Sequence, residues 1–160
     1  MIRRATPEDV PALVELVYDL AEYERAREQC ALTPRLLETA LFGPEPAVFA
    51  HVATDSSPDR VVGCAIWFLN YSTWTGKHGI YLEDLYVRPE ARGRGLGKEL
   101  LAELAREAVA NDYTRVDWSV LDWNTPSIEF YRRLGAAAQD EWTGFRLSGD
   151  ALTRLAESGS

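Results

Sequence analysis

The sequence predicts an α/β protein in which a mixed, mostly antiparallel central sheet is flanked by helices. Strand-like runs first follow one another and then alternate with helix-like segments, which favours this fold class. A chain of 160 residues can bury a core of its own, and no repeat, linker or low-complexity tract divides it. We therefore expect a single domain over residues 1–160.

The first third of the chain predicts a strand and two helices. Residues 1–5 have the length of a short edge strand. In Thr6–Pro7 a hydroxyl cap precedes proline, as is typical of a helix start, and apolar residues then recur at helical spacing: Val10, Leu13, Val14, Val17 and Leu20. Thr33–Pro34 repeats the signal for a shorter helix, which Gly43–Pro44 ends.

The middle of the chain predicts consecutive strands. Residues 48–54 and 61–71 are rich in β-branched and aromatic side chains, and the turn signal at 55–59 between them indicates a hairpin. Residues 72–79 read as a polar loop, and 80–87 as a further strand.

The last part alternates helices and strands. Helical periodicity runs from 96 to 111 and is followed by a strand at 116–121. A helix at 124–134 is closed by Gly135, and a short strand at 144–148 precedes a C-terminal helical turn.

Charge and composition restrict the partners. The formal net charge is −8 at pH 7. Nucleic acids and anionic membranes bind clustered surface cations, so we expect neither as the main partner and favour a cationic one. An alternative is that the acidity only keeps the protein soluble.

Neither secretion nor a metal centre is indicated. The N-terminus lacks an apolar signal segment and no apolar run approaches the roughly 20 residues that span a bilayer, so we expect a cytoplasmic protein. Cys30, Cys64, His51 and His78 are too scattered to suggest a zinc site, and we expect no metal.

A glycine-rich turn occupies residues 88–98, between a predicted strand and a predicted helix. Glycines at 93, 95 and 97 let a ligand approach the backbone, and the start of the next helix attracts phosphate. Neither the Walker pattern nor GxGxxG fits the spacing. The turn is thus a candidate pyrophosphate cradle, although such turns also serve as plain tight connections.

This turn carries a family resemblance. Arg92-x-x-Gly95-x-Gly97, after a strand that ends in Tyr86-Val87, resembles the acetyl-CoA signature of the GNAT superfamily of N-acetyltransferases, and the resemblance extends to Asn124, residues 130–136 and residues 2–6. It implies a GNAT fold and acetyl-CoA as co-substrate.

Within that superfamily the chain is most similar to the diamine (spermidine/spermine) acetyltransferase group. Residues 20–24, 71–77, 81–87 and 120–124 carry this similarity, which is strongest to the thialysine N-epsilon-acetyltransferase branch. The chain departs from the polyamine enzymes at Thr143, where they have an acidic residue, and this weakens a spermidine assignment.

The resemblance assigns residues to acetyl-CoA. The backbone of Leu85, Tyr86 and Val87 is expected to bind the pantetheine arm. Residues of the turn would enclose the pyrophosphate: Arg92, Gly93, Arg94, Gly95, Leu96, Gly97 and Lys98. The arm would also meet Asn124, Ser127 and Tyr131 from the opposite side.

Two residues are predicted to be catalytic. An aliphatic ammonium with a pKa near 10.4 must lose a proton before it attacks, and Glu83 is the candidate base. The alternative is that Glu83 is only a surface carboxylate on a strand edge. Tyr131 is the candidate acid for the departing thiolate, whereas a tyrosine near a helix end is otherwise usually a half-buried anchor. By strand alternation, Asp84 is expected to have a structural or electrostatic role.

The acceptor is predicted to be a small cationic amine: a diamine, a polyamine or a thialysine-like amino acid. Tyr23, Glu24, Trp74 and Glu83 match segments that line the family's amine site. The resemblance also implies a homodimer. Rival hypotheses are an acetyltransferase for proteins or peptides, and a non-catalytic sensor of acetyl-CoA or polyamines.

Overall fold

The computed structural model describes residues 1–56 and 59–159. The chain forms two compact units, Met1–Leu121 and Asp122–Ser160. Residues 57 and 58 of the predicted turn at 55–59 lie outside the described residues.

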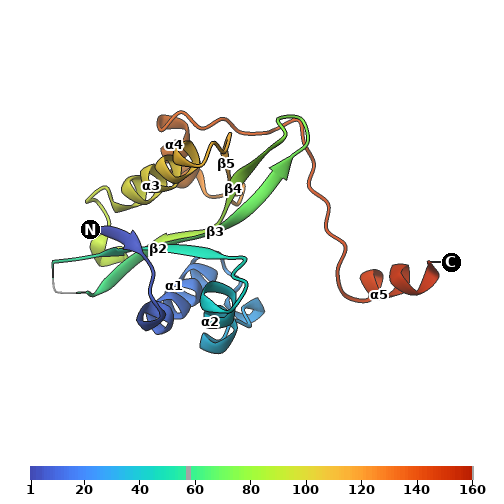
Figure 1. Cartoon of the computed structure of the whole chain (residues 1–160), viewed down its shortest axis with the longest axis horizontal. Coiled ribbons are helices and arrows are strands. Elements are labelled where there is room, and N and C mark those ends of the chain that lie inside the picture. Colours follow the sequence, from blue (N-terminus) through green and yellow to red (C-terminus); the bar gives the residue numbers. More distant parts are fainter. Residues whose placement is uncertain (57–58, 160) are drawn as a thin grey trace. The chain divides into compact units, whose positions relative to one another are not determined.

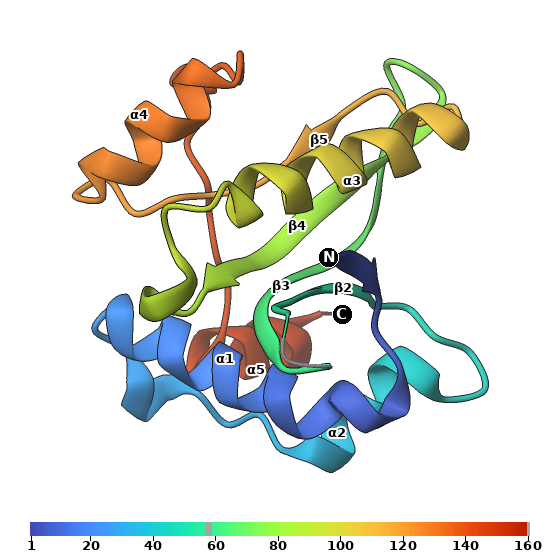
Figure 2. The ribbon, with the colours of Figure 1, turned by 90° about the vertical axis from the view of Figure 1, so that its left-hand side faces the viewer.

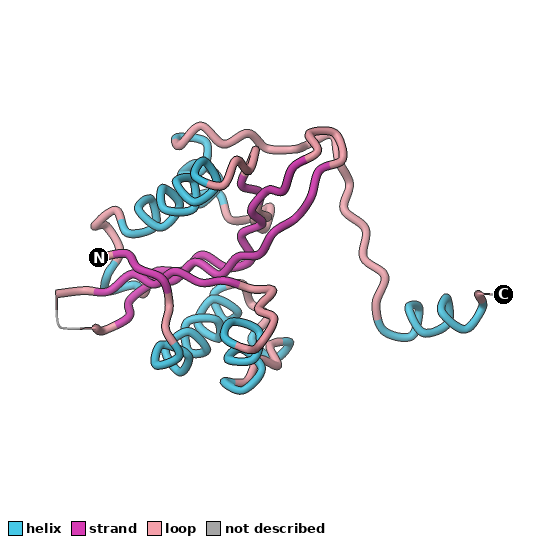
Figure 3. The backbone as a smooth tube through the Cα atoms, viewed as in Figure 1, coloured by secondary structure: helices cyan, strands magenta, loops and turns pink. Residues whose placement is uncertain are grey.

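The first unit is built on a five-stranded sheet in the order β1-β2-β3-β4-β5. Its strands are β1 (Ile2–Arg4), β2 (Phe49–Thr54), β3 (Val61–Ser72), β4 (Lys77–Val87) and β5 (Val116–Asp117). The first three pairings are antiparallel, and β5 runs parallel to β4. The two longest strands, β3 and β4, form the hairpin that dominates the sheet (Figure 3). The predicted mixed, mostly antiparallel sheet is confirmed.

Helices cover both faces of this sheet (Figures 1 and 2). One face carries α1 (Val10–Tyr23) and α2 (Pro34–Phe42), and the other carries α3 (Leu96–Ala110). Short 3-10 helices connect the elements: η1 (Pro7–Asp9), η2 (Arg27–Gln29) and η3 (Pro89–Ala91).

The start of the first helical segment is fixed by Asp9. Its carboxylate accepts hydrogen bonds from the Thr6 backbone N–H at 2.8 Å and from the Arg3 guanidinium at 2.7 Å. Burial alone would raise the pKa of Asp9, but these hydrogen bonds lower it. The chain leaves η1 as α1, and the predicted helix start at Thr6–Pro7 is confirmed.

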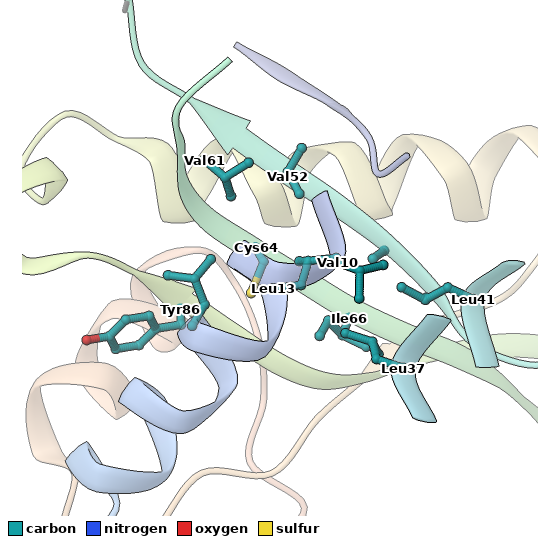
Figure 4. Close-up of a cluster of buried hydrophobic side chains, with 11 residues drawn as sticks. Val10, Leu13, Leu37, Leu41, Val52, Val61, Cys64, Ile66 and Tyr86 are labelled. Carbon is teal, nitrogen blue, oxygen red and sulfur yellow. The ribbon is translucent and has the colours of Figure 1, made fainter. Parts of the chain in front are cut away.

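The core beneath α1 and α2 follows the predicted pattern (Figure 4). Residues from these two helices pack against β2, β3 and β4: Val10, Leu13, Leu16, Leu37, Leu41, Ala50, Val52, Val61, Cys64, Ile66 and Tyr86. The ring of Tyr86 lies at one end of this cluster, with its hydroxyl directed away from it. The helical stripe predicted for residues 10–20 is therefore the core face of α1, and Leu16 belongs to it as well.

Two strand predictions in this sheet need correction. β4 begins at Lys77 and not at 80, because its first residues pair with the end of β3 and leave only residues 73–76 as the turn. β5 covers two residues and not 116–121, because it pairs with β4 only at Ile80 and Tyr81.

The second unit holds α4 (Thr125–Arg133) and α5 (Gly149–Ser158). The predicted strand at 144–148 is wrong: this segment has no strand conformation, since no neighbouring strand within the unit supplies hydrogen bonds. Gly135, with φ of 96°, follows α4 in the left-handed region, as expected of a residue that closes a helix.

Candidate active site

The strand pair β3–β4 contains one extra residue, and it is Glu83. Asp84 pairs with Ile66. Leu82 pairs with Trp67, the residue that directly follows Ile66, so Glu83 has no counterpart on β3. Such a β-bulge bends the strand and redirects a side chain, frequently beside an active site. Glu83 is exposed here, between buried Leu82 and half-buried Asp84.

Beyond this bulge, one edge of β4 is open. β5 pairs with β4 only at Ile80 and Tyr81, and in the part of the chain that the structure describes no other strand pairs along that edge. Backbone N–H and C=O groups on an open edge can bind an extended ligand as an added strand would. Residues 85–87, predicted to bind the pantetheine arm, lie in this stretch.

Three carboxylates gather at the bulge. Burial, and next the negative charges of Glu83 and Glu24, raise the pKa of Asp84 to about 7. Burial and the charge of Glu83 also raise the pKa of Glu24. The predicted acceptor residues Glu24 and Glu83 are thus brought together, and Asp84 joins them. A bound cation would relieve the repulsion among the three groups.

The glycine-rich turn has the geometry that an anion site needs. Gly93 and Gly95 have φ of 82° and 80°, in the left-handed region that favours glycine. Gly95 precedes α3 and provides no capping side chain, and nothing lies within 4 Å of the position that a Cβ would take at either glycine. The first N–H groups of α3 have no intrahelical acceptor, so they are available to an anion.

The side chains of the turn supply positive charge in an acidic protein. Arg92, Arg94 and Lys98 are all exposed, and Leu96 and Gly97 lie half-buried at the start of α3. An open turn, a helix N-terminus and three cations fit the pyrophosphate of a coenzyme A molecule.

Arg92 also contacts residues outside the turn. Its Nε donates a hydrogen bond of 2.9 Å to the Val87 carbonyl. Its guanidinium carbon lies 5.4 Å from the ring centroid of Tyr86 and 5.9 Å from that of Tyr23. The predicted acceptor residue Tyr23 therefore meets the predicted phosphate turn directly.

Trp74 is not brought to the carboxylates. It lies in the turn between β3 and β4 with 89% of its surface exposed. The strand from Lys77 to Glu83 alone spans about 20 Å. Its role in amine binding stays a prediction.

In the second unit, the predicted arm-binding residues have local structural partners. The Asn124 side-chain oxygen accepts a 3.4 Å hydrogen bond from the Ser127 N–H and so caps α4. Tyr131 is half-buried, and its ring centroid lies 5.5 Å from that of Phe130. The roles of these residues with acetyl-CoA, and of Tyr131 as an acid, stay predictions.

The histidines and cysteines show no metal arrangement. Across residues 1–56 and 59–159, no group of three or more His, Cys, Asp or Glu side chains could hold a metal ion. His51 is buried, and its Nδ1 accepts a 3.1 Å hydrogen bond from Trp67 Nε1. Cys30 and Cys64 are free thiols, and burial raises the pKa of Cys64. No helix within the described residues is long and apolar enough to cross a bilayer.

Sequence reasoning missed two features of this site. The raised pKa of Asp84 comes from burial and from the charges of Glu83 and Glu24, and the bulge beside it arises from pairing with β3; neither leaves a local sequence signal. The contact between Arg92 and Tyr23 joins residues far apart in the chain. The acidic residues in the segments 20–24 and 81–87 were the sequence signal that could have indicated that these two segments meet.

Comparison with known proteins agrees with this geometry. Residues 13–136 match the family model "Acetyltransferase (GNAT) family", and the match runs across the boundary between the two units. The chain is 36% identical to the thialysine N-epsilon-acetyltransferase of Bos taurus, with 98% of this chain and 96% of the relative covered. It is 32% identical to an L-ornithine N5-acetyltransferase of Arabidopsis thaliana, with 96% and 86% covered.

A solved structure shares the fold. An integron cassette protein from the mobile metagenome of V. cholerae superimposes with a TM-score of 0.80 at 27% identity, and 98% of this chain and 97% of that one are covered. The family match and the relatives together establish the assignment. The chain belongs to the GNAT family of acetyltransferases and is an N-acetyltransferase that uses acetyl-CoA as its co-substrate.

Proposed function

We propose that this enzyme transfers the acetyl group of acetyl-CoA directly to the primary amine of a small cationic substrate, such as a diamine, a polyamine or a thialysine-like amino acid. The observation that carries this proposal is the group of three carboxylates at the β4 bulge, Glu24, Glu83 and Asp84. The names of the relatives, which specify acetylation at N-epsilon of thialysine and at N5 of ornithine, support the same class of acceptor.

The chain's own groups would hold the donor. The open edge of β4 from Leu85 to Val87 is suited to an extended amide-bearing arm, and the turn from Arg92 to Lys98 is suited to its pyrophosphate. Acetyl-CoA supplies an activated thioester. An arm bound along this edge would follow the same strand that carries Glu83 and Asp84.

The carboxylates would bind the amine and remove its proton. Glu83 is exposed at the bulge and can reach a ligand beside β4, so we assign it the ammonium contact and proton acceptance, directly or through water. Asp84 adds a second negative charge once it ionises near pH 7. Glu24 and the ring of Tyr23 extend the cation-binding surface to the end of α1.

Tyr131 is proposed to protonate the departing thiolate. The family resemblance of residues 124–134 supports this role, and a phenol with a reference pKa of about 10 matches a thiolate of similar basicity. Asn124 and Ser127 are proposed to contact the pantetheine arm, also by resemblance.

We further propose a cytoplasmic homodimer in which residues 1–160 act as one domain. The free thiols of Cys30 and Cys64 are consistent with a reducing compartment. The exposed rings of Tyr71 and Trp74 beside the β3–β4 turn offer apolar surface to a second copy. Light scattering over a range of concentrations tests this, and a monomer at every concentration refutes the dimer.

The acceptor class is tested by following CoA release from acetyl-CoA with a panel of diamines, polyamines, thialysine, lysine, ornithine and peptides. We expect turnover with the short amines. Preference for peptides would instead indicate a protein acetyltransferase, and CoA binding without turnover of any amine would indicate a sensor.

A further inference from the structure

Arg92 belongs to the glycine-rich turn of residues 88–98, and its side chain also reaches the C-terminal end of α1, where the predicted acceptor residue Tyr23 lies. Its Nε is bound to the Val87 carbonyl at 2.9 Å, so the side chain folds back along the end of β4. Its guanidinium carbon lies 5.4 Å from the Tyr86 ring and 5.9 Å from the Tyr23 ring. A guanidinium within about 6 Å of an aromatic ring centroid is attracted to the ring face.

The two rings differ in their surroundings. Tyr86 belongs to the buried core with 9% of its surface exposed, so it is a fixed support. Tyr23 is the last residue of α1, and 42% of its surface is exposed. Arg25, two residues later, has φ of 62°, a conformation that a non-glycine residue rarely adopts. Local backbone hydrogen bonds close the helix there, among them one of 2.9 Å from the Ala26 N–H to the Ala21 carbonyl. The contact with Arg92 adds a tertiary interaction to the last side chain of α1.

The residue after Tyr23 is Glu24, whose pKa is raised by burial and next by the negative charge of Glu83. Tyr23 and Glu24 thus connect Arg92 on one side with the carboxylates of the bulge on the other. A shift of the backbone at Tyr23 would also move Glu24, because the two residues are adjacent in the chain.

We propose that Arg92 is a positioning residue that holds the end of α1 through the ring of Tyr23, so that the coenzyme turn and the amine site support each other. The amine part of this inference rests on the proposed function. The contact of Arg92 with Tyr23 also preorganises the turn, and preorganisation increases affinity because less freedom is lost on binding.

The first test measures CoA affinity by calorimetry. Tyr23 lies outside the turn, yet Tyr23→Leu is expected to weaken CoA binding about two- to five-fold, the range that one exposed cation–ring contact contributes. Tyr23→Phe keeps the ring and should bind CoA as the wild type does. In an Arg92→Gln background, Tyr23→Leu should have no further effect, because the contact is already lost.

A matched control lies on the same helix. The guanidinium carbon of Arg27, in η2, lies 5.2 Å from the ring of Tyr18 on α1, and neither residue belongs to the turn. Arg27→Gln removes a contact of the same kind, so it should leave the CoA dissociation constant unchanged even if it lowers the melting temperature. Equal CoA affinity in wild type and Tyr23→Leu, or additive effects of Tyr23→Leu and Arg92→Gln, would overturn the proposal.

The second test measures KM for the best amine of the panel. Tyr23→Leu and Arg92→Gln should each raise this KM about two- to five-fold, and together no more than the larger single effect. The single and double variants of Tyr23 and Arg92 form a double-mutant cycle. If their effects on CoA affinity are not additive but no amine is acetylated, the proposed function fails while the link between Tyr23 and Arg92 stands. If amines are acetylated and both cycles are additive, the function stands and the link is refuted.

Discussion

The carboxyl groups of Glu83 and Asp84 are neighbours along β4 but have different surroundings. Glu83 is the extra residue of the bulge and is exposed, whereas Asp84 pairs with Ile66 and is half-buried. Burial and the charges of Glu83 and Glu24 raise the pKa of Asp84 to about 7. One short stretch of strand thus offers a cation two carboxylates, one of which changes its charge near neutral pH.

Amine binding is therefore expected to depend on pH through Asp84. The affinity for a diamine should increase about three- to ten-fold between about pH 6 and pH 8, because a second carboxylate becomes charged while the amine, with a pKa near 10, stays cationic. Calorimetry with CoA present measures this without turnover. Asp84→Asn should lose most of the increase, and an unchanged pH dependence in that variant would remove Asp84 from the site.

The same group should reduce stability above neutral pH. The folded-state pKa of Asp84 is raised above its ordinary value of 3.8, so the folded protein holds a proton that the unfolded chain releases. Stability due to this group is fully present below about pH 4 and is lost as the pH rises toward 7. Asp84→Asn should therefore raise the free energy of unfolding by up to about 4 kcal/mol near pH 8 and by little near pH 4. Thermal melts at both pH values check this, and equal effects at both would contradict the assignment.

Substitutions at the glycines of residues 88–98 should act through backbone strain more than through steric clashes. Gly95 has φ of 80°, but nothing lies within 4 Å of the place that a methyl side chain would occupy, so Gly95→Ala strains the backbone by about 1–2 kcal/mol without a clash. The turn relieves this strain by changing its conformation, so CoA affinity should fall roughly ten-fold. Gly144→Ala, also in open space but with no positive φ, is the control. Equal CoA affinity of the Gly95 variant and the control would refute the assignment of this turn as the pyrophosphate site.

Tyr131→Phe should lower kcat at least ten-fold with little change in CoA affinity. The ring keeps its packing against Phe130, and the hydroxyl group that would donate the proton is removed. Steady-state kinetics and calorimetry on the same preparation separate the two effects. A variant that turns over at the wild-type rate would show that another group, or water, protonates the thiolate.

The sequence was sufficient where local pattern decides the structure. The stripe of Val10, Leu13 and Val17 predicts the core face of α1, and the glycines of residues 88–98 predict the turn that precedes α3. The family signature in that turn predicts the fold, the donor and the class of reaction, all of which the comparisons support.

Features that depend on pairing between distant segments were not predictable. The bulge at Glu83 exists because β3 and β4 change register there. The predicted strand at 144–148 does not form, because no neighbouring strand in its unit pairs with it. The contact of Arg92 with Tyr23 likewise depends on how α1 packs beside the end of β4. The alternation of apolar and polar side chains along a single strand predicts neither the bulge, nor the missing strand, nor this contact.

The negative charge of Glu83 is the central requirement of the proposed acceptor site. Glu83→Gln keeps the size and hydrogen bonding of the side chain but removes the negative charge and the basicity, so both amine binding and proton removal should suffer. Because exposed charges are screened by salt, the wild-type KM for a diamine should rise with ionic strength and that of the variant should respond less.

The most direct test is therefore kcat/KM of wild type and Glu83→Gln for the best amine of the panel, measured at saturating acetyl-CoA. We expect the variant to fall at least a hundred-fold, or about 2.7 kcal/mol of transition-state stabilisation, with CoA affinity retained. A variant that acetylates the amine as efficiently as the wild type would show that Glu83 is neither the base nor the cation contact, and would contradict the proposed acceptor site.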